Sequence, residues 1–143
     1  PNDNYALGFG YTRTETYDGT SCDNPDSTAG PGSAACNDEM NVRVPRHQVN
    51  IVGKKNINDN LSHTIKLKYV GKTRDFGNAN QSPTFEDVTL PDYMVVDLVT
   101  KYKLFDIYNL NISAKNIFDK NYSQAYEYKA PGRSINFTLN QLF

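Results

Sequence analysis

The chain has 143 residues, of which 38% are hydrophobic and 12% aromatic, and its formal net charge is −1 at pH 7. The near-neutral charge and the dispersed lysines argue against a nucleic-acid partner, which requires clustered basic residues. The aromatic content excludes a disordered chain, whereas the mean hydropathy of −0.65 is low for a globular core. The length suits one domain, and no apolar run approaches the ~20 residues of a membrane-spanning helix.

Apolar and polar residues alternate along six stretches, which is the signal of a β-strand with two different faces. In the first stretch Tyr5, Leu7 and Phe9 alternate with small residues, and in the last Ile135 and Phe137 alternate with polar ones. The expected strands cover residues 4–16, 46–54, 61–71, 93–102, 107–118 and 132–143. All seven prolines fall outside the strand interiors, as the hydrogen-bonded ladder requires.

The alternation assigns each strand residue to a face. The apolar set, expected on a convex surface, is Tyr5, Leu7, Phe9, Val49, Ile51, Ile65, Leu67, Val96, Leu98, Leu110, Ile112, Ile135, Phe137 and Leu139. The polar set, expected on a concave surface, is Gln48, Asn50, Lys66, Lys68, Asp97, Lys101, Asn109, Asn111, Ser113, Lys115, Asn136, Thr138 and Asn140. A slip of one residue would reverse a whole strand.

Long and short connections also alternate. Long polar loops are expected at 17–44, 72–92 and 119–131, and short turns at 55–60 and 103–106. Strands of about 10 residues exceed the ~5–6 typical of soluble sheets and suit a tilted strand that crosses a bilayer. These patterns predict an all-β, antiparallel, up-and-down transmembrane barrel with its long loops at one end.

The C-terminal stretch resembles TonB-dependent outer-membrane receptors. The resemblance is most specific over Lys115–Phe143: NIFDKNY, an aromatic loop with Tyr126 and Tyr128, APGR, and a last strand that ends in Phe143. It continues more loosely through VPRHQVNI at 44–51 and YMVVDL at 93–98.

This resemblance implies a 22-stranded barrel around an N-terminal plug domain, of which the chain would be the six C-terminal strands. An open six-stranded sheet in lipid would leave two unpaired edges. Neither the plug nor a leader peptide is recognisable in the sequence, because Pro1 opens no basic and apolar leader segment. We therefore expect the sequence to begin within a longer chain that is located in the bacterial outer membrane.

The family's pattern also implies ligand and partners. The transported ligand would be a ferric siderophore or a related chelate such as cobalamin or haem, with no covalently bound cofactor. The partners would be outer-membrane lipid, the inner-membrane TonB energy-coupling complex acting through the plug, and the barrel-assembly machinery. The last of these would read the terminal strand, which ends in Phe143.

Aromatic and cationic residues of the long loops are the candidate ligand contacts, because ring faces and guanidinium groups suit an anionic, ring-bearing chelate. They are Arg74, Phe76, Phe85, Tyr126, Tyr128 and Arg133. The alternative is that the aromatic residues form an interface belt. For Arg133 the alternative is that it holds the last loop against the barrel.

Cys22 and Cys36 lie in one acidic loop. In an exported protein such a pair favours a disulfide, which would contribute roughly 3 kcal/mol in the chain-entropy model; two free thiols are the alternative. The loop's aspartates could bind calcium, but their spacing matches no ordered ligand set. A solvated acidic loop is favoured, and no metal site is assigned.

No catalytic motif such as G-x-S-x-G or H-E-x-x-H occurs, so no enzymatic activity is predicted. Two alternatives to a receptor stay open. A soluble β-sandwich acting as an adhesion or carbohydrate-binding module would show the same alternation but would bury the apolar set beneath a second layer. A passive outer-membrane pore or an enzyme barrel would share the barrel and lack the plug.

Overall fold

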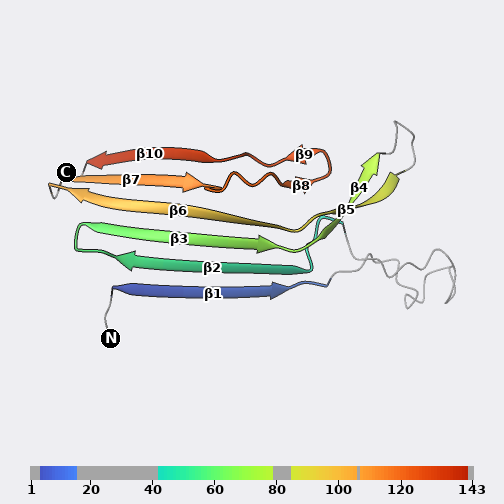
Figure 1. The fold of residues 1–143 in the computed structure, drawn as a ribbon, viewed down its shortest axis with the longest axis horizontal. Coiled ribbons are helices and arrows are strands. Elements are labelled where there is room, and N and C mark those ends of the chain that lie inside the picture. Colours follow the sequence, from blue (N-terminus) through green and yellow to red (C-terminus); the bar gives the residue numbers. More distant parts are fainter. Residues whose placement is uncertain (1–3, 16–41, 79–84, 106, 142–143) are drawn as a thin grey trace, which may run out of the picture.

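The computed structural model describes residues 4–15, 42–78, 85–105 and 107–141, with side chains undescribed at 78 and 85–87. Ten strands occur in these ranges (Figure 1). No helix of the described part has the length and apolar character needed to cross a membrane. Cys22, Cys36 and Phe143 lie outside the described residues, so the disulfide and the terminal signal stay predictions.

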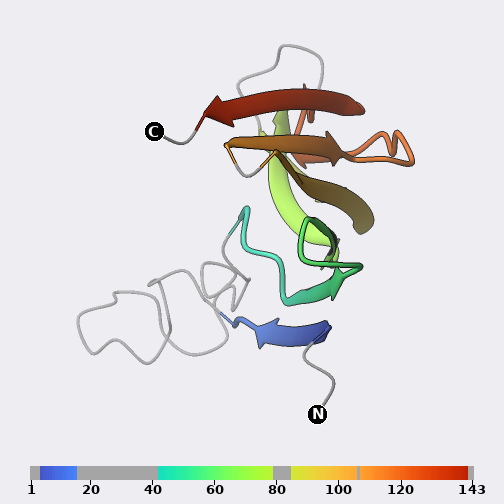
Figure 2. The same cartoon turned by 90° about the vertical axis from the view of Figure 1, so that its left-hand side faces the viewer.

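Six strands form one antiparallel sheet in the order β1-β2-β3-β6-β7-β10. They are β1 (Tyr5–Arg13), β2 (His47–Asn56), β3 (Leu61–Val70), β6 (Tyr93–Leu104), β7 (Tyr108–Lys115) and β10 (Ser134–Gln141). Each of these strands pairs with the next along the chain, which confirms an all-β, antiparallel, up-and-down arrangement. The sheet is curved but not closed, with β1 and β10 at its opposite edges (Figure 2).

Two of the connections expected to be loops contain hairpins instead. β4 (Thr73–Asn78) pairs with β5 (Phe85–Leu90), and β8 (Ser123–Ala125) pairs with β9 (Tyr128–Lys129). In β4 the buried residues do alternate with more exposed ones, but they are polar or lack a side chain: Thr73, Asp75 and Gly77. Since the sequence pattern was an alternation of apolar residues, it could not reveal this strand.

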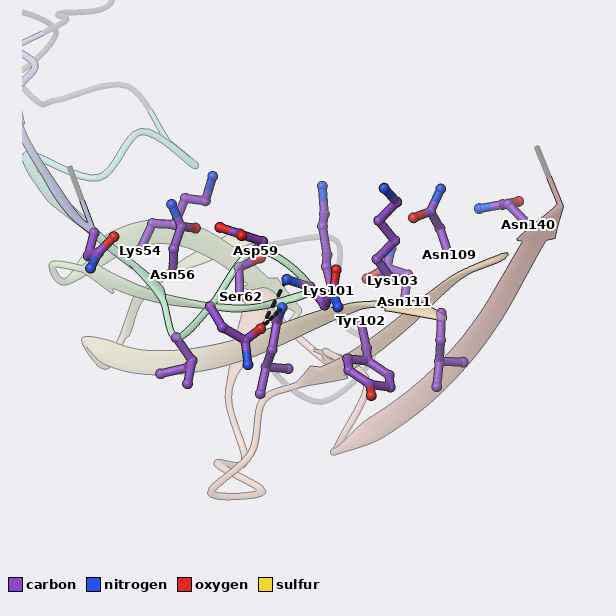
Figure 3. Close-up of a pocket in the computed structure, with 16 residues that line it drawn as sticks. Lys54, Asn56, Asp59, Ser62, Lys101, Tyr102, Lys103, Asn109, Asn111 and Asn140 are labelled. Carbon is purple, nitrogen blue, oxygen red and sulfur yellow. Dashed lines mark hydrogen bonds between the residues drawn. The ribbon is translucent and has the colours of Figure 1, made fainter. Parts of the chain in front are cut away.

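The register confirms the predicted faces. Paired residues of an antiparallel sheet share a face, and Phe9 pairs with Ile51, Ile51 with Leu67, and Leu67 with Val96. The remaining pairs keep every member of the apolar set on this face and every member of the polar set on the other. The polar face is the concave one: Lys101 and Lys103 project from it in Figure 3, whereas Tyr102 projects from the opposite side.

The apolar face is largely uncovered within the described part of the chain. The exposed fraction is 82% for Leu7, 71% for Phe9 and 70% for Phe137. Val96 is the exception at 8%, and its carbonyl accepts a hydrogen bond from Ile117 N at 2.9 Å, where the chain turns after β7. The described residues thus lack the second layer that a β-sandwich would place over this face.

The two short turns lie at one end of the sheet and the β4–β5 and β8–β9 hairpins at the other (Figure 1). In the turn after β2, Asn58 Oδ1 accepts hydrogen bonds from the backbone N–H groups of Asn60 and Leu61, at 3.0 and 2.8 Å. In the turn after β6, Phe105 has a left-handed backbone conformation with φ of 49°. The end that carries the hairpins is called the long-loop end below.

The two faces predict opposite responses to charge at neighbouring positions of β6. Leu98 lies on the apolar face, paired with Ile65, and Val99 on the polar face, paired with Thr64. Leu98→Lys should destabilise the membrane-inserted barrel by roughly 2–4 kcal/mol, because its ammonium group would face lipid, while Val99→Lys should cost much less. Equilibrium unfolding of the full-length protein in vesicles measures both variants, and equal destabilisation would contradict the facing.

Candidate functional site

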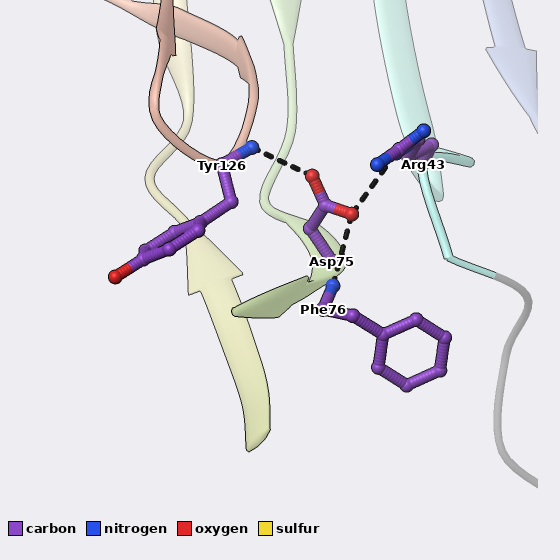
Figure 4. Close-up of polar contacts among 4 residues, drawn as sticks. All are labelled: Arg43, Asp75, Phe76 and Tyr126. Carbon is purple, nitrogen blue, oxygen red and sulfur yellow. Dashed lines mark hydrogen bonds and ion pairs between the residues drawn. The ribbon is translucent and has the colours of Figure 1, made fainter. Parts of the chain in front are cut away.

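A buried carboxylate joins three parts of the long-loop end. Asp75 of β4 has no exposed surface. Its Oδ1 accepts hydrogen bonds from Arg43 Nε at 3.0 Å and Phe76 N at 2.9 Å, and its Oδ2 accepts one from Tyr126 N at 2.6 Å (Figure 4). These donors come from the segment before β2, from β4 and from the β8–β9 turn. The four residues are called the Asp75 node below.

The node keeps Asp75 ionised. Burial raises the pKa of its carboxyl group, but the two backbone hydrogen bonds and the Arg43 guanidinium outweigh burial and leave the pKa below its usual value. Arg43 is the more exposed partner, with 63% of its side chain accessible. Solvent therefore screens the ion pair, so the two backbone N–H groups hold the carboxylate more strongly than Arg43 does.

Close packing adds to this polar anchor. A Cβ atom on Gly77 would lie 2.5 Å from Val88 Cγ2 and 3.3 Å from Tyr126 Cε1. The Tyr126 ring thus lies against the backbone of β4, where only glycine leaves room for it. β5 and β8 are also in contact, so the two hairpins pack together.

A second polar anchor holds the start of the connection between β7 and β10. Asn116 is buried and left-handed, with φ of 49°, which ends β7 there. Its N–H donates to Asp97 Oδ1 at 2.9 Å, and its side-chain amide exchanges two hydrogen bonds with the Lys120 backbone. Further along, Tyr93 and Tyr122 stack with ring centroids 4.2 Å apart.

Two of the sequence-predicted contacts, Phe76 and Tyr126, belong to the Asp75 node, and a third, Arg74, lies next to it. Arg74 accepts a hydrogen bond from Arg43 N through its carbonyl at 2.7 Å, and its guanidinium carbon lies 5.9 Å from the Phe76 ring centroid. Phe76 is 47% exposed. Tyr126 contributes its N–H to Asp75 and its ring to the packing on Gly77, so part of its role is structural.

The other predicted contacts are less closely grouped. Tyr128 lies on β9 and is 75% exposed. Arg133 lies before β10, where its backbone N–H donates to Asp119 Oδ1 at 2.8 Å. Phe85 pairs with Asn78 in the β4–β5 hairpin, and its side chain is outside what the structure describes.

Asp75 and Asn116 were not singled out from the sequence. No local motif marks Asp75, because two of its three donors, Arg43 and Tyr126, are 32 and 51 residues away in the chain. The signal for Asn116 was present in the NIFDKNY motif, since Asn is the residue most tolerant of left-handed backbone after glycine.

The concave face forms a polar hollow at the short-turn end. It has a volume of about 850 Å³, and Lys54, Lys101, Lys103, Asn109 and Asn111 are among the residues that line it (Figure 3). Asn111 Oδ1 is a buried acceptor without a partner among the described atoms. No group of three or more His, Cys, Asp or Glu that could hold a metal ion occurs in the described ranges.

Asp75→Asn tests the node. Because the folded-state pKa is lowered, the carboxylate contributes its stability above about pH 3.9 and loses it as pH falls through the folded-state pKa. At neutral pH the variant should lose about 1–3 kcal/mol of local stability, since one carboxylate oxygen becomes an NH2 group that cannot accept from the N–H group facing it. Hydrogen-exchange rates at the Phe76 and Tyr126 amides measure this local stability, with Asp92→Asn, at an exposed position, as the control.

The wild type should reach the exchange rates of the Asp75→Asn variant only below about pH 4. Unchanged exchange in Asp75→Asn at neutral pH would contradict the anchor.

Gly77→Ala tests the packing. The added methyl group should destabilise the contact between hairpins by about 1–3 kcal/mol, as overpacking does, and Val88→Ala in the same chain should restore much of it. Gly53→Ala is the matched control, because its Cβ would meet no atom within 4 Å. Limited proteolysis of the long-loop end reports the effect. Equal protection of Gly77→Ala and Gly53→Ala would argue against a tight contact.

Comparison with known proteins gives a match at the level of structure alone. No family model and no curated protein sequence matches the chain. Solved structures do match, and nearly the whole chain is superposed in the three that follow.

The ferripyoverdine receptor of the Pseudomonas aeruginosa outer membrane superposes on 96% of the chain, with a TM-score of 0.72 and 18% identity. The ferric-catecholate import receptor Fiu of E. coli K12 superposes on 98%, with a TM-score of 0.72 and 18% identity. The siderophore receptor PirA of Acinetobacter baumannii superposes on 99%, with a TM-score of 0.72 and 15% identity.

The chain spans only 17%, 19% and 20% of these three receptors. It therefore matches one segment of these larger proteins, and its own sheet is open at β1 and β10. The resemblance of its C-terminal sequence to TonB-dependent receptors is thus confirmed at the level of the fold: the chain folds like a segment of the β-barrels of outer-membrane siderophore receptors.

Proposed function

We propose that the chain is the C-terminal barrel segment of an outer-membrane receptor that imports a ferric siderophore by TonB-dependent, energy-coupled transport. The observation that carries the proposal is the superposition of nearly the whole chain on siderophore receptors, at TM-scores of 0.72 to 0.74. The ferric siderophore is preferred to cobalamin or haem, because the matched structures are siderophore receptors by name.

The two faces of the sheet support a location in the outer membrane. The apolar face is exposed, as a lipid contact requires, and the lysines and asparagines of the sheet's concave face suit a wet lumen. The long-loop end supports ligand capture, since the Asp75 node holds Arg74 and Phe76 beside each other there. A cation and an exposed ring suit an anionic chelate with aromatic groups.

The rest of the machinery belongs to the same proposal. A barrel of 22 strands would supply the partners for the edges of β1 and β10. A plug domain would couple the barrel to the TonB complex, and the barrel-assembly machinery would insert it. The reaction is transport without covalent chemistry. The competing functions are a passive pore and an enzyme barrel. Energy-dependent uptake distinguishes a receptor from a passive pore.

Energy coupling is therefore the first test. Cells that carry the full-length protein should accumulate radioactive iron from its ferric siderophore, and collapse of the proton gradient should abolish uptake while siderophore binding persists. A strain lacking the protein supplies the baseline. Uptake that continues unchanged without the gradient would identify a passive pore instead.

Phe76 provides the test of the ligand-contact site. Phe76→Ala should weaken siderophore binding by about five- to tenfold, the equivalent of one aromatic contact of about 1 kcal/mol or slightly more. Phe105→Ala is the matched control, because Phe105 is 85% exposed in a turn at the opposite end of the sheet. Binding to intact cells measures both variants. Equal affinities would remove Phe76 from the site.

The assembly role proposed for Phe143 has its own test. Phe143→Ser should strongly reduce the amount of heat-modifiable barrel in the outer membrane, because the resemblance makes this residue the terminal insertion signal. Gln141→Ser, two positions earlier in the chain, serves as the control. Normal membrane levels of the Phe143 variant would refute the assignment.

A further inference from the structure

We propose that the apolar face carries a binding site for an anionic phospholipid next to the short turns, with Lys55 holding the phosphate and an acyl chain lying over Gly53. This inference rests on the membrane location proposed above but not on the identity of the transported ligand. It starts from a gap in the apolar face.

The gap is at Gly53. This residue lies on the apolar face between Leu7 of β1 and Ile65 of β3, with which it pairs. A Cβ atom at Gly53 would meet nothing within 4 Å, while Leu7 and Ile65 are 82% and 53% exposed and stand on either side. The result is a shallow groove of about 610 Å³, lined also by Tyr5 and Leu98.

The groove ends at a lysine without an anionic partner. Lys55 pairs with Tyr5 and His63, so all three lie on the apolar face. The ammonium group of Lys55 lies 5.3 Å from the centroid of the Tyr5 ring. None of the carboxylates in the described ranges forms an ion pair with it, and the nearby Asp59 lies on the concave side (Figure 3).

Charge selects the occupant. In the six-stranded sheet the apolar face carries two permanent cations and no anion: Lys55 near the short turns and Arg13 near the long-loop end. Arg13 forms an ion pair with Glu15. Lys55 is therefore the cation of this face that is left for an external anion, and at a membrane surface this anion is a lipid phosphate.

The neighbouring residues fit the same ligand. Tyr5 offers its hydroxyl at the level of the headgroups, where tyrosine is enriched. His63 Nδ1 lies 2.9 Å from Thr100 Oγ1, which fixes the ring and leaves Nε2 available to a headgroup oxygen. Leu7 and Ile65 provide the apolar walls on which an acyl chain can lie.

The experiment uses the full-length receptor in phosphatidylcholine vesicles that contain a minor fraction of phosphatidylglycerol. In parallel samples one or the other lipid carries a photoreactive group in its acyl chain, and mass spectrometry maps the cross-links. The groove of β1, β2 and β3 should react about fivefold more with phosphatidylglycerol, the ratio expected from one lysine at the membrane surface. The apolar face of β10, at Phe137 and Leu139, should show no such preference.

Three variants make the result specific. Lys55→Gln should abolish the preference, while Lys54→Gln, which changes the neighbouring lysine on the concave face, should retain it. Gly53→Leu should reduce cross-linking by both lipids, with Gly53→Ala as the milder variant if the larger residue impairs folding. Equal reaction of both lipids in the wild type, or equal effects of the two lysine variants, would overturn the site. Iron uptake, measured separately, shows whether the receptor function stands regardless.

Discussion

The two-residue register of the β-ladder is the constraint on which the rest of the structure depends. Every backbone pairing from β1 to β10 joins residues of the same face, so one misplaced residue would exchange the faces of a whole strand. In a membrane this exchange would bring Lys66 and Lys68 to the lipid, at roughly 2–4 kcal/mol for each lysine near the midplane. The alternation therefore specifies the strand pairing, and it also supports the membrane location proposed above.

The long-loop end depends on a different kind of interaction. Val70, Leu90 and Tyr93 form a small buried apolar cluster there, and buried polar groups hold the segments around it. Asp75 accepts hydrogen bonds from three segments, and Asn116 connects β6 to the connection after β7. Such anchors are directional, because each donor must point at its acceptor. They place Arg74 and Phe76 in a defined position on the β4–β5 hairpin, as a binding surface requires.

The two ends of the sheet consequently differ in chemistry. At the long-loop end the buried Asp75 fixes a hairpin that carries the Arg74 guanidinium beside the exposed Phe76 ring, which suits the proposed capture of an anionic ligand. The short-turn end has lysines and asparagines on the concave side and one unpaired lysine beside an apolar groove on the convex side. Strand β2 supplies Lys54 to the concave side and Lys55 to the convex side, since neighbouring residues of a strand point to opposite faces.

The sequence by itself determined the fold class, the six long strands, the faces of their residues and the resemblance to outer-membrane receptors, because all of these are encoded in a period of two and in local motifs. It also indicated Arg74, Phe76 and Tyr126 by their chemistry alone. Only the tertiary structure revealed the β4–β5 hairpin, whose first strand buries Thr73, Asp75 and Gly77 rather than apolar residues. Only the tertiary structure joined Asp75 to Arg43 and Tyr126, because hydrogen bonds between residues 32 and 51 positions apart leave no periodic trace in the chain.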